Sequence, residues 1–120
     1  MLQKIAFTMY SVADIARARN FYEDTLGLKV GMHGSHGDMH WVEYDLPGGG
    51  CLALTNTTGQ PPGGGGTIAF EVSDLDILIA DLKTKGVAFE GDIIKGPHCR
   101  MANCRDSEGN ALVLHQLDKK

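Results

Sequence analysis

The 120-residue chain repeats one pattern at a spacing of 60 residues, and this repeat limits its possible folds more than any other feature. Val12–Ile15 corresponds to Val72–Leu75. Near the end of each half, one glycine and two leucines recur at the same spacing: Gly49, Leu52 and Leu54 correspond to Gly109, Leu112 and Leu114. The sequence therefore predicts two copies of one structural unit.

Each copy begins with a predicted strand and an amphipathic helix. The strand-like runs cover residues 5–12 and 67–72. Asp14 and Asp74 follow them, at positions where a carboxylate can accept hydrogen bonds from the first N–H groups of a helix. Apolar residues at helical spacing predict helices over about residues 15–26 and 75–85. Each predicted helix ends at a glycine, Gly27 or Gly86, which is suited to the left-handed conformation found there.

Three further strands are predicted after each helix: residues 29–33, 39–45 and 51–55 in the first half, and 88–93, 99–105 and 111–116 in the second. This order predicts an α+β fold of two tandem βαβββ modules in a single domain. One helix covers only one face of a four-stranded sheet, so the uncovered faces should meet each other or a partner chain. We expect a curved sheet around a shared cavity. Module 1 would cover about residues 1–58, a Gly/Pro-rich linker about 59–66, and module 2 about 67–120.

Composition and charge exclude several classes of protein. The net charge of −4 and the pI of about 5.6 argue against a nucleic-acid binder, which would carry a basic stripe. No apolar run approaches the roughly 18 residues of a membrane span, and polar residues interrupt the start of the chain where a signal peptide would be apolar. We therefore expect a cytoplasmic protein without membrane or nucleic-acid partners. Three cysteines without a C-x-x-C pair indicate reduced thiols.

Two motifs resemble those of a known family. Val12-x-Asp14 followed by Phe21-Tyr22-Glu23-Asp24-x-Leu26-Gly27-Leu28 resembles the first-module signature of the glyoxalase/bleomycin-resistance/extradiol-dioxygenase superfamily, also called vicinal oxygen chelate proteins. Asp106–Asn110 resembles its closing D-P-D-G-N turn, with Ser107 in place of proline. The resemblance implies paired βαβββ modules around a cavity and a homodimer. It implies no single reaction, since members include isomerases, epimerases, dioxygenases, thiol transferases and drug-binding proteins.

The resemblance also implies where a divalent metal ion would bind. Enzymes of the family use four positions, which in this chain are occupied by Phe7, Ala53, Thr67 and Val113. None of these side chains is an imidazole, carboxylate or thiolate, the donors that replace the hydration shell of such an ion. We therefore predict no metal and no other cofactor. A site outside the family pattern, built from His98, His115 and a glutamate, remains an alternative.

Strand alternation predicts which residues face the cavity. A strongly apolar set suits packing under the helices: Leu52, Leu54, Ile68, Phe70, Val72, Leu112 and Leu114. The opposite parity supplies candidates for ligand binding: Phe7, Met9, Trp41, Met101 and Asn103. The same face supplies candidates for catalysis: Glu43, Glu71 and His115. A carboxylate in an apolar cavity tends to have a raised pKa, which suits proton abstraction or the binding of a cation.

Ordinary structural roles remain open for these residues. The two glutamates can be solvated groups at strand ends, His115 and Asn103 can satisfy neighbouring polar groups, and Trp41 can be a core aromatic residue. Of the other histidines, His33 and His36 are expected in a hairpin tip and His40 on the helix-facing side of its strand.

The sequence thus predicts a protein that binds a small, partly apolar organic molecule in a metal-free cavity. The alternative is an enzyme of lyase, isomerase or dioxygenase type that uses Glu43, Glu71 or His115 for acid–base chemistry, or an unconventional metal site. A third possibility is a module whose active partner is another chain.

Overall fold

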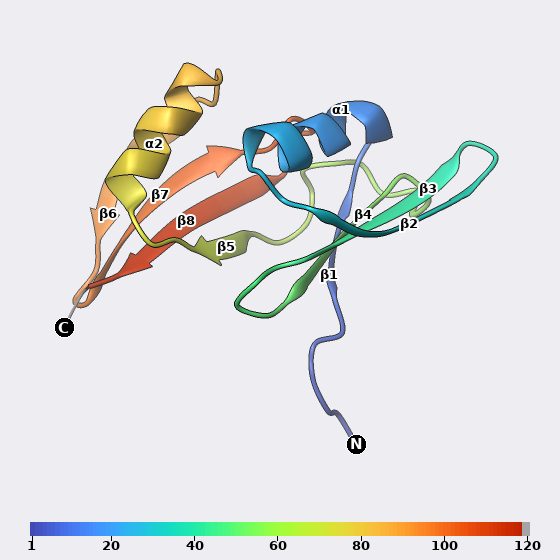
Figure 1. Cartoon of the computed structure of the whole chain (residues 1–120), viewed down its shortest axis with the longest axis horizontal. Helices are drawn as coiled ribbons and strands as arrows, with labels where there is room; N and C mark the ends of the chain where they lie inside the picture. The colour runs from blue at the N-terminus through green and yellow to red at the C-terminus, as the bar shows by residue number, and fades with distance from the viewer. Residues whose placement is uncertain (119–120) are drawn as a thin grey trace.

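The computed structural model describes residues 1–118 and contains two four-stranded sheets, each carrying a helix on one face (Figure 1). The first module comprises β1 (Thr8–Ser11), α1 (Ile15–Asn20), the π-helical turn η1 (Phe21–Thr25), β2 (Val30–His36), β3 (Met39–Asp45) and β4 (Cys51–Thr55). The second comprises β5 (Ile68–Glu71), α2 (Leu75–Thr84), β6 (Phe89–Lys95), β7 (Cys99–Arg105) and β8 (Ala111–Leu117). The sheet orders are β1-β4-β3-β2 and β5-β8-β7-β6, which confirms the predicted α+β fold of two βαβββ modules.

The 60-residue repeat persists in the pairing of the strands. β1 runs parallel to β4, and the pair Met9–Ala53 recurs as Ala69–Val113 between β5 and β8. The antiparallel pair Trp41–Thr55 likewise recurs as Met101–His115. The two modules therefore share one register, so equivalent positions face the same side of each sheet.

Both helices begin at the predicted caps. The Asp14 carboxylate accepts a hydrogen bond from the Arg17 N–H at 3.0 Å, and the Asp74 carboxylate accepts one from the Ile77 N–H at 3.1 Å. Such a cap satisfies an N–H group that has no partner inside the helix. Gly27 and Gly86 have positive φ angles of 78° and 88°, as predicted for the residues that end the helical segments.

Two predicted elements of module 1 differ from the structure. The first strand begins at Thr8 rather than at residue 5, because the residues opposite its predicted start belong to the glycine-rich β3–β4 turn and offer no strand to pair with. The first helix becomes a wide π turn at Phe21, whose carbonyl accepts the Leu26 N–H. This turn buries both Phe21 and Tyr22 against the sheets.

The β2–β3 hairpin also differs from the prediction. β2 extends to His36, and the turn is formed by Gly37 and Asp38. His33 and His36 therefore lie in a strand and not in a hairpin tip. The ring of His33 stacks on that of His40 with a centroid distance of 5.5 Å, so cross-strand pairing holds the segment that was expected to be a loop.

The apolar core lies between the helices and the sheets. The predicted inward leucines Leu52, Leu54, Leu112 and Leu114 are at most 2% exposed. Under α1 the core reaches into the second sheet through Leu112, and Leu26 belongs to the packing around both helices. Burial of this surface is the main favourable contribution to folding, and it joins the two modules.

A polar contact, here called the clasp, also joins the modules: it consists of Asp106, Glu108 and Asn110 in the β7–β8 turn. The Asp106 carboxylate accepts a hydrogen bond from the Tyr22 hydroxyl at 2.8 Å. The Glu108 carboxylate accepts the N–H groups of Ala13 and Asp14 at 3.0 and 2.9 Å. The second module therefore caps the first helix from outside, where negative charge is favoured.

The other contacts of the clasp secure the start of module 1 and the linker. The Arg17 guanidinium donates to Glu108 at 2.6 Å, and the Asn110 amide donates to the Ser11 carbonyl at 3.1 Å. The Asn110 side-chain oxygen accepts the Gly63 N–H at 2.8 Å. Gly63 has a φ of 83°, and a Cβ atom added there would be 3.0 Å from the Gly109 carbonyl oxygen, so a side chain at this position would strain the linker.

Within residues 1–118, neither helix has the length and apolar character that crossing a membrane requires.

We predict that Glu108→Gln lowers the free energy of unfolding by about 1–3 kcal/mol, because a buried, hydrogen-bonded carboxylate loses its charge beside Arg17. Glu90→Gln is the matched control, since Glu90 pairs with Arg105 on the surface. It should change the stability by about 0.5 kcal/mol or less. Denaturant unfolding measures both, and equal effects would contradict a structural role for the clasp.

The clasp also predicts how stability depends on pH. Burial raises the pKa of Glu108, but the hydrogen bonds from Arg17 and the backbone outweigh it and lower this pKa from 4.5 to about 2. The unfolded chain therefore takes up this proton first as the pH falls, and the stabilisation, complete above about pH 4.5, is lost towards pH 2. Between about pH 4.5 and pH 2, the free energy of unfolding should decrease less steeply with falling pH in Glu108→Gln than in the wild type. The same pH dependence of stability in both proteins would contradict the lowered pKa of Glu108.

Candidate functional site

The strand register places the predicted site residues on the two sheet faces that the helices leave uncovered, here called the open faces. On the first sheet, Met9, Ala53 and Glu43 are successive cross-strand partners, and Trp41 has the same parity as Glu43. Phe7 lies just before β1 and contacts Trp41. The first open face thus carries four of the predicted residues together: Phe7, Met9, Trp41 and Glu43.

The second open face carries the remaining four predicted residues. Glu71, His115 and Met101 form one cross-strand row, and Asn103 lies beside Val113 in the next row. The site residues of one chain therefore form two separate groups, one on each sheet.

Trp41 is held in place by Glu43. The indole N–H donates to the Glu43 carboxylate at 2.6 Å, and the Cys51 thiol donates to its other oxygen at 3.7 Å. The Phe7 ring meets the Trp41 ring edge-on, with centroids 5.1 Å apart and an interplanar angle of 89°. Glu43 therefore orients an aromatic platform, and its use as an acid–base group stays a prediction.

Glu71 and His115 form a close pair on the second open face. One Glu71 oxygen lies 2.6 Å from His115 Nδ1, and the other accepts the Leu117 N–H at 2.9 Å. These two hydrogen bonds, the first from His115 and the second from the backbone, lower the pKa of Glu71. The predicted rise in the pKa of this carboxyl is therefore wrong: both of its oxygens accept hydrogen bonds. Strand alternation alone does not reveal these donors.

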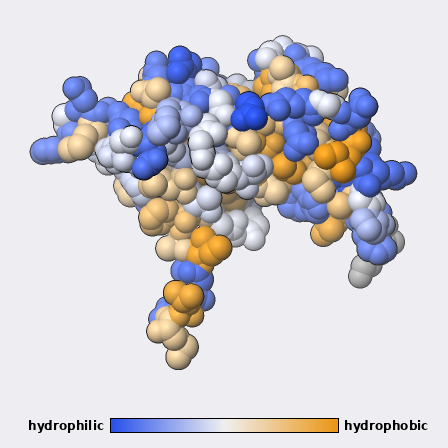
Figure 2. Space-filling model, turned by 180° about the vertical axis from the view of Figure 1, so that it is seen from behind, coloured by the Kyte–Doolittle hydropathy of each residue, from blue (hydrophilic) through white to orange (hydrophobic). Residues whose placement is uncertain are grey.

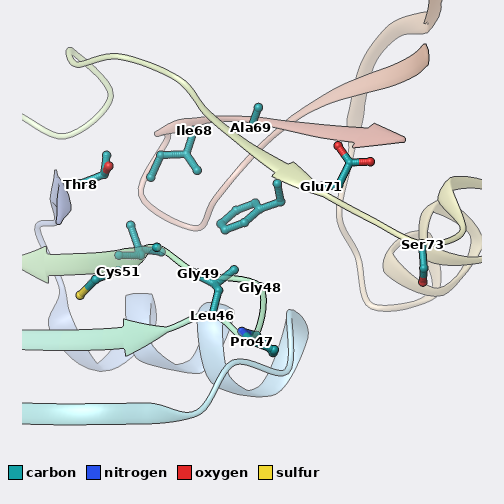
Figure 3. Close-up of a pocket in the computed structure, with 13 residues that line it drawn as sticks. Thr8, Leu46, Pro47, Gly48, Gly49, Cys51, Ile68, Ala69, Glu71 and Ser73 are labelled. Atoms are coloured by element: carbon teal, nitrogen blue, oxygen red, sulfur yellow. The ribbon is translucent and has the colours of Figure 1, made fainter. Parts of the chain in front are cut away.

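A cleft lies between the two modules, where the β3–β4 turn approaches β5, and has a volume of about 580 Å³ (Figure 3). Figure 3 shows that Ile68 points into this space from β5, whereas Ala69 points away. Of the predicted site residues, Glu71 alone is among those that line the cleft. A smaller cavity of about 250 Å³ includes Met9 and the linker.

The cleft arises from a difference between the two copies that sequence reasoning missed. The β3–β4 turn Leu46–Gly50 corresponds to the β7–β8 turn Asp106–Asn110, and Gly48 occupies the position of Glu108. Gly48 has no side chain that could reach Ser73, two residues before α2, so the space that corresponds to the clasp of α1 stays open there. Aligning the two turns at the repeat spacing is the signal that would have found it.

The four positions of the family's metal site carry residues that do not fit a divalent ion. Ala53 and Val113 lie opposite Met9 and Ala69, and Phe7 and Thr67 stand just before β1 and β5. A phenyl, a methyl, an isopropyl and a single hydroxyl group do not form a donor set for such an ion. Across residues 1–118, no group of three or more His, Cys, Asp and Glu side chains has an arrangement that could hold a metal ion.

His33 and His40 lie outside both groups. His40 is on the helix-facing side of β3, as predicted, where its Nδ1 is 3.3 Å from His33 Nε2. Arg19 approaches the other nitrogen of His33 at 3.3 Å. The three cysteines are free thiols, and burial raises the pKa of Cys104 to about 11.

Comparisons with solved structures identify many similar chains. TnmS3, an antibiotic binding protein from Streptomyces sp. CB03234, is 25% identical with a TM-score of 0.81, covering 98% of this chain and 100% of its own. A glyoxalase/bleomycin resistance protein from the same organism is 29% identical with a TM-score of 0.75, covering 92% and 100%. Leishmania major glyoxalase I is 25% identical with a TM-score of 0.76, covering 98% and 87%.

No curated protein shows significant sequence similarity to this chain. A family profile, however, matches residues 4–114, which is nearly the whole sequence and includes both modules. Together with the duplicated βαβββ topology, this match shows that the chain belongs to the Glyoxalase/Bleomycin resistance protein/Dioxygenase superfamily.

Proposed function

We propose that this protein binds a small, partly apolar organic molecule without a metal ion, in cavities that form when the open faces of two copies meet. The aromatic platform of Trp41 and Phe7 is the observation that carries the proposal. The indole N–H of Trp41 donates to Glu43 and therefore keeps a hydrogen-bond partner when the ring is covered by an apolar ligand. The antibiotic-binding relative TnmS3 supports a binding role.

The exposure of the open faces supports a homodimer. Met9, Met32 and Met39 on the first sheet are between 41% and 50% exposed, and Ile94 and Leu117 on the second are 47% and 58% exposed. Figure 2 shows further exposed hydrophobic side chains on the N-terminal arm and over the second module. Exposed apolar side chains gathered on one face are typical of an interface.

Two-fold symmetry determines how two copies would cover this surface. If the first sheet of one copy faces the second sheet of its partner, the same contact forms twice and no apolar face is left over. Each of the two cavities would then combine the aromatic platform from one copy with Glu71 and His115 from the other. Contributions from both copies agree with the separation of the site residues into two groups.

An enzymatic function is the second candidate, favoured by the contact between Glu71 and His115. A histidine oriented by a carboxylate is a common acid–base arrangement. In this case the bound molecule would be the substrate, and His115 would accept a proton from it or donate one to it. Recovery of a chemically altered ligand after incubation with the protein distinguishes this candidate from simple binding.

To test binding, we would screen small aromatic compounds, including antibiotics, for those that raise the thermal unfolding midpoint. Trp41→Ala should weaken the binding of a confirmed compound about three- to tenfold, because an aromatic contact is lost. Ile77→Ala, on the exposed surface of α2, is the control and should bind normally. Isothermal titration calorimetry measures the affinities before and after treatment with a chelator.

Two results would contradict this proposal. Unchanged affinity in Trp41→Ala would exclude the aromatic platform as the binding surface. Loss of binding after chelation, with recovery on adding a divalent ion, would exclude the metal-free site.

The homodimer is tested by placing a charge on an open face. Wild-type protein should have a mass about twice the 12.9 kDa of one chain by light scattering. Met9→Lys should shift it towards the monomer, because a buried ammonium group is strongly disfavoured. Ile77→Lys adds the same charge on the helix side and should remain dimeric. A monomeric wild type, or equal behaviour of the two variants, would contradict the proposed interface.

A further inference from the structure

The contact between Glu71 and His115 determines which nitrogen of the imidazole carries the proton. In a neutral histidine one ring nitrogen is a donor and the other an acceptor. The lowered pKa of Glu71 keeps this group ionised, and an ionised carboxylate only accepts hydrogen bonds. His115 Nδ1, 2.6 Å from the Glu71 oxygen, must therefore be the donor. The acceptor lone pair of the neutral ring is then on Nε2.

Nε2 of His115 is free to meet a ligand. None of the hydrogen bonds among residues 1–118 uses this atom, and the side chain is 25% exposed on the second open face. Its cross-strand neighbour on the side away from Glu71 is Met101, which is followed by Ile94. A polar acceptor in these apolar surroundings can orient a ligand through a hydrogen bond, which Met101 and Ile94 cannot do.

The pair belongs to one module only, although the fold is duplicated. The same register position in module 1 joins Ser11 to Thr55. The Thr55 hydroxyl is fully buried and donates to the His40 carbonyl, and Ser11 contacts the Thr58 hydroxyl. A βαβββ module therefore forms without a carboxylate–histidine pair, so the scaffold does not require the one in module 2.

We propose that His115 Nε2 accepts a hydrogen bond from a hydroxyl group of the bound molecule, and that Glu71 is the positioning residue that holds the imidazole in the required tautomer. This inference rests on the proposed binding function and specifies its ligand class. The ligand is an aromatic or partly apolar molecule with a neutral hydroxyl group. The negative charge of Glu71 beside the ring disfavours a carboxylate in the same place.

The tautomer can be measured without any ligand. Long-range ¹H–¹⁵N NMR of the imidazole, recorded at increasing pH until the spectrum no longer changes, reports which nitrogen of the neutral ring is protonated. We expect the proton of His115 on Nδ1 in the wild type and on Nε2 in Glu71→Ala. The control Glu90→Ala removes a surface carboxylate that pairs with Arg105, and it should leave the His115 spectrum unchanged. A wild-type ring protonated on Nε2 would overturn the inference.

Selectivity for a hydroxyl is tested with 2-naphthol and 2-methoxynaphthalene, since methylation removes the donor and keeps the naphthalene ring and the oxygen atom. At about pH 7.5, calorimetry on the wild type should give about five- to tenfold tighter binding of 2-naphthol, the range expected for one hydrogen bond. His115→Phe keeps a ring but removes the acceptor, and the preference should disappear while 2-methoxynaphthalene still binds. Folding of the variant is checked by its thermal unfolding midpoint.

The outcomes separate this inference from the proposed function. Equal affinity of the wild type for the two probes would overturn the hydroxyl contact and leave the binding function intact. If neither probe binds while the Nδ1–H tautomer is observed, the proposed ligand class is overturned, whereas the role of Glu71 in holding the tautomer stands and the binding function depends on the thermal unfolding screen.

Discussion

The clasp at the β7–β8 turn is the interaction on which the arrangement of the two modules depends. Glu108 brings a buried carboxylate to the start of α1, where two backbone N–H groups and Arg17 satisfy it. Asp106 binds the hydroxyl of Tyr22, whose pKa is raised by burial and by this carboxylate, so that Tyr22 remains a donor. Buried polar groups tolerate few alternative partners, which ties module 2 to one position on module 1.

This position leaves the uncovered face of each sheet available. Both helices lie on one side of the molecule (Figure 1), and several apolar side chains of the open faces are 41–58% exposed. The first turn, between β3 and β4, forms no contact like the clasp in the described chain, and a cleft lined by its glycines opens between it and β5. One duplicated unit has thus acquired two different roles: the second turn holds the modules together, and the first leaves space between them.

The two open faces also differ in chemistry. The first presents an aromatic surface whose carboxylate is occupied in orienting Trp41, and the second presents an oriented histidine. Neither Glu43 nor Glu71 is an isolated carboxyl group in apolar surroundings, because each accepts hydrogen bonds from its neighbours. If the proposed binding function is correct, the first sheet supplies the apolar contact and the second sheet the directional hydrogen bond. A ligand would then have to contact both sheets.

Sequence alone determined the duplicated βαβββ order, the caps at Asp14 and Asp74, the inward leucines and the lack of metal donors at four family positions. These features follow from local conformational preferences, from strand alternation and from the chemistry of single side chains. Only the tertiary structure decided that Glu43 supports Trp41, that Glu71 meets His115, and that a cleft opens beside Gly48. Glu71 and His115 are 44 residues apart, and Glu108 binds backbone groups more than 90 residues away. Such contacts depend on strand order and side-chain rotamers, which a one-dimensional pattern does not specify.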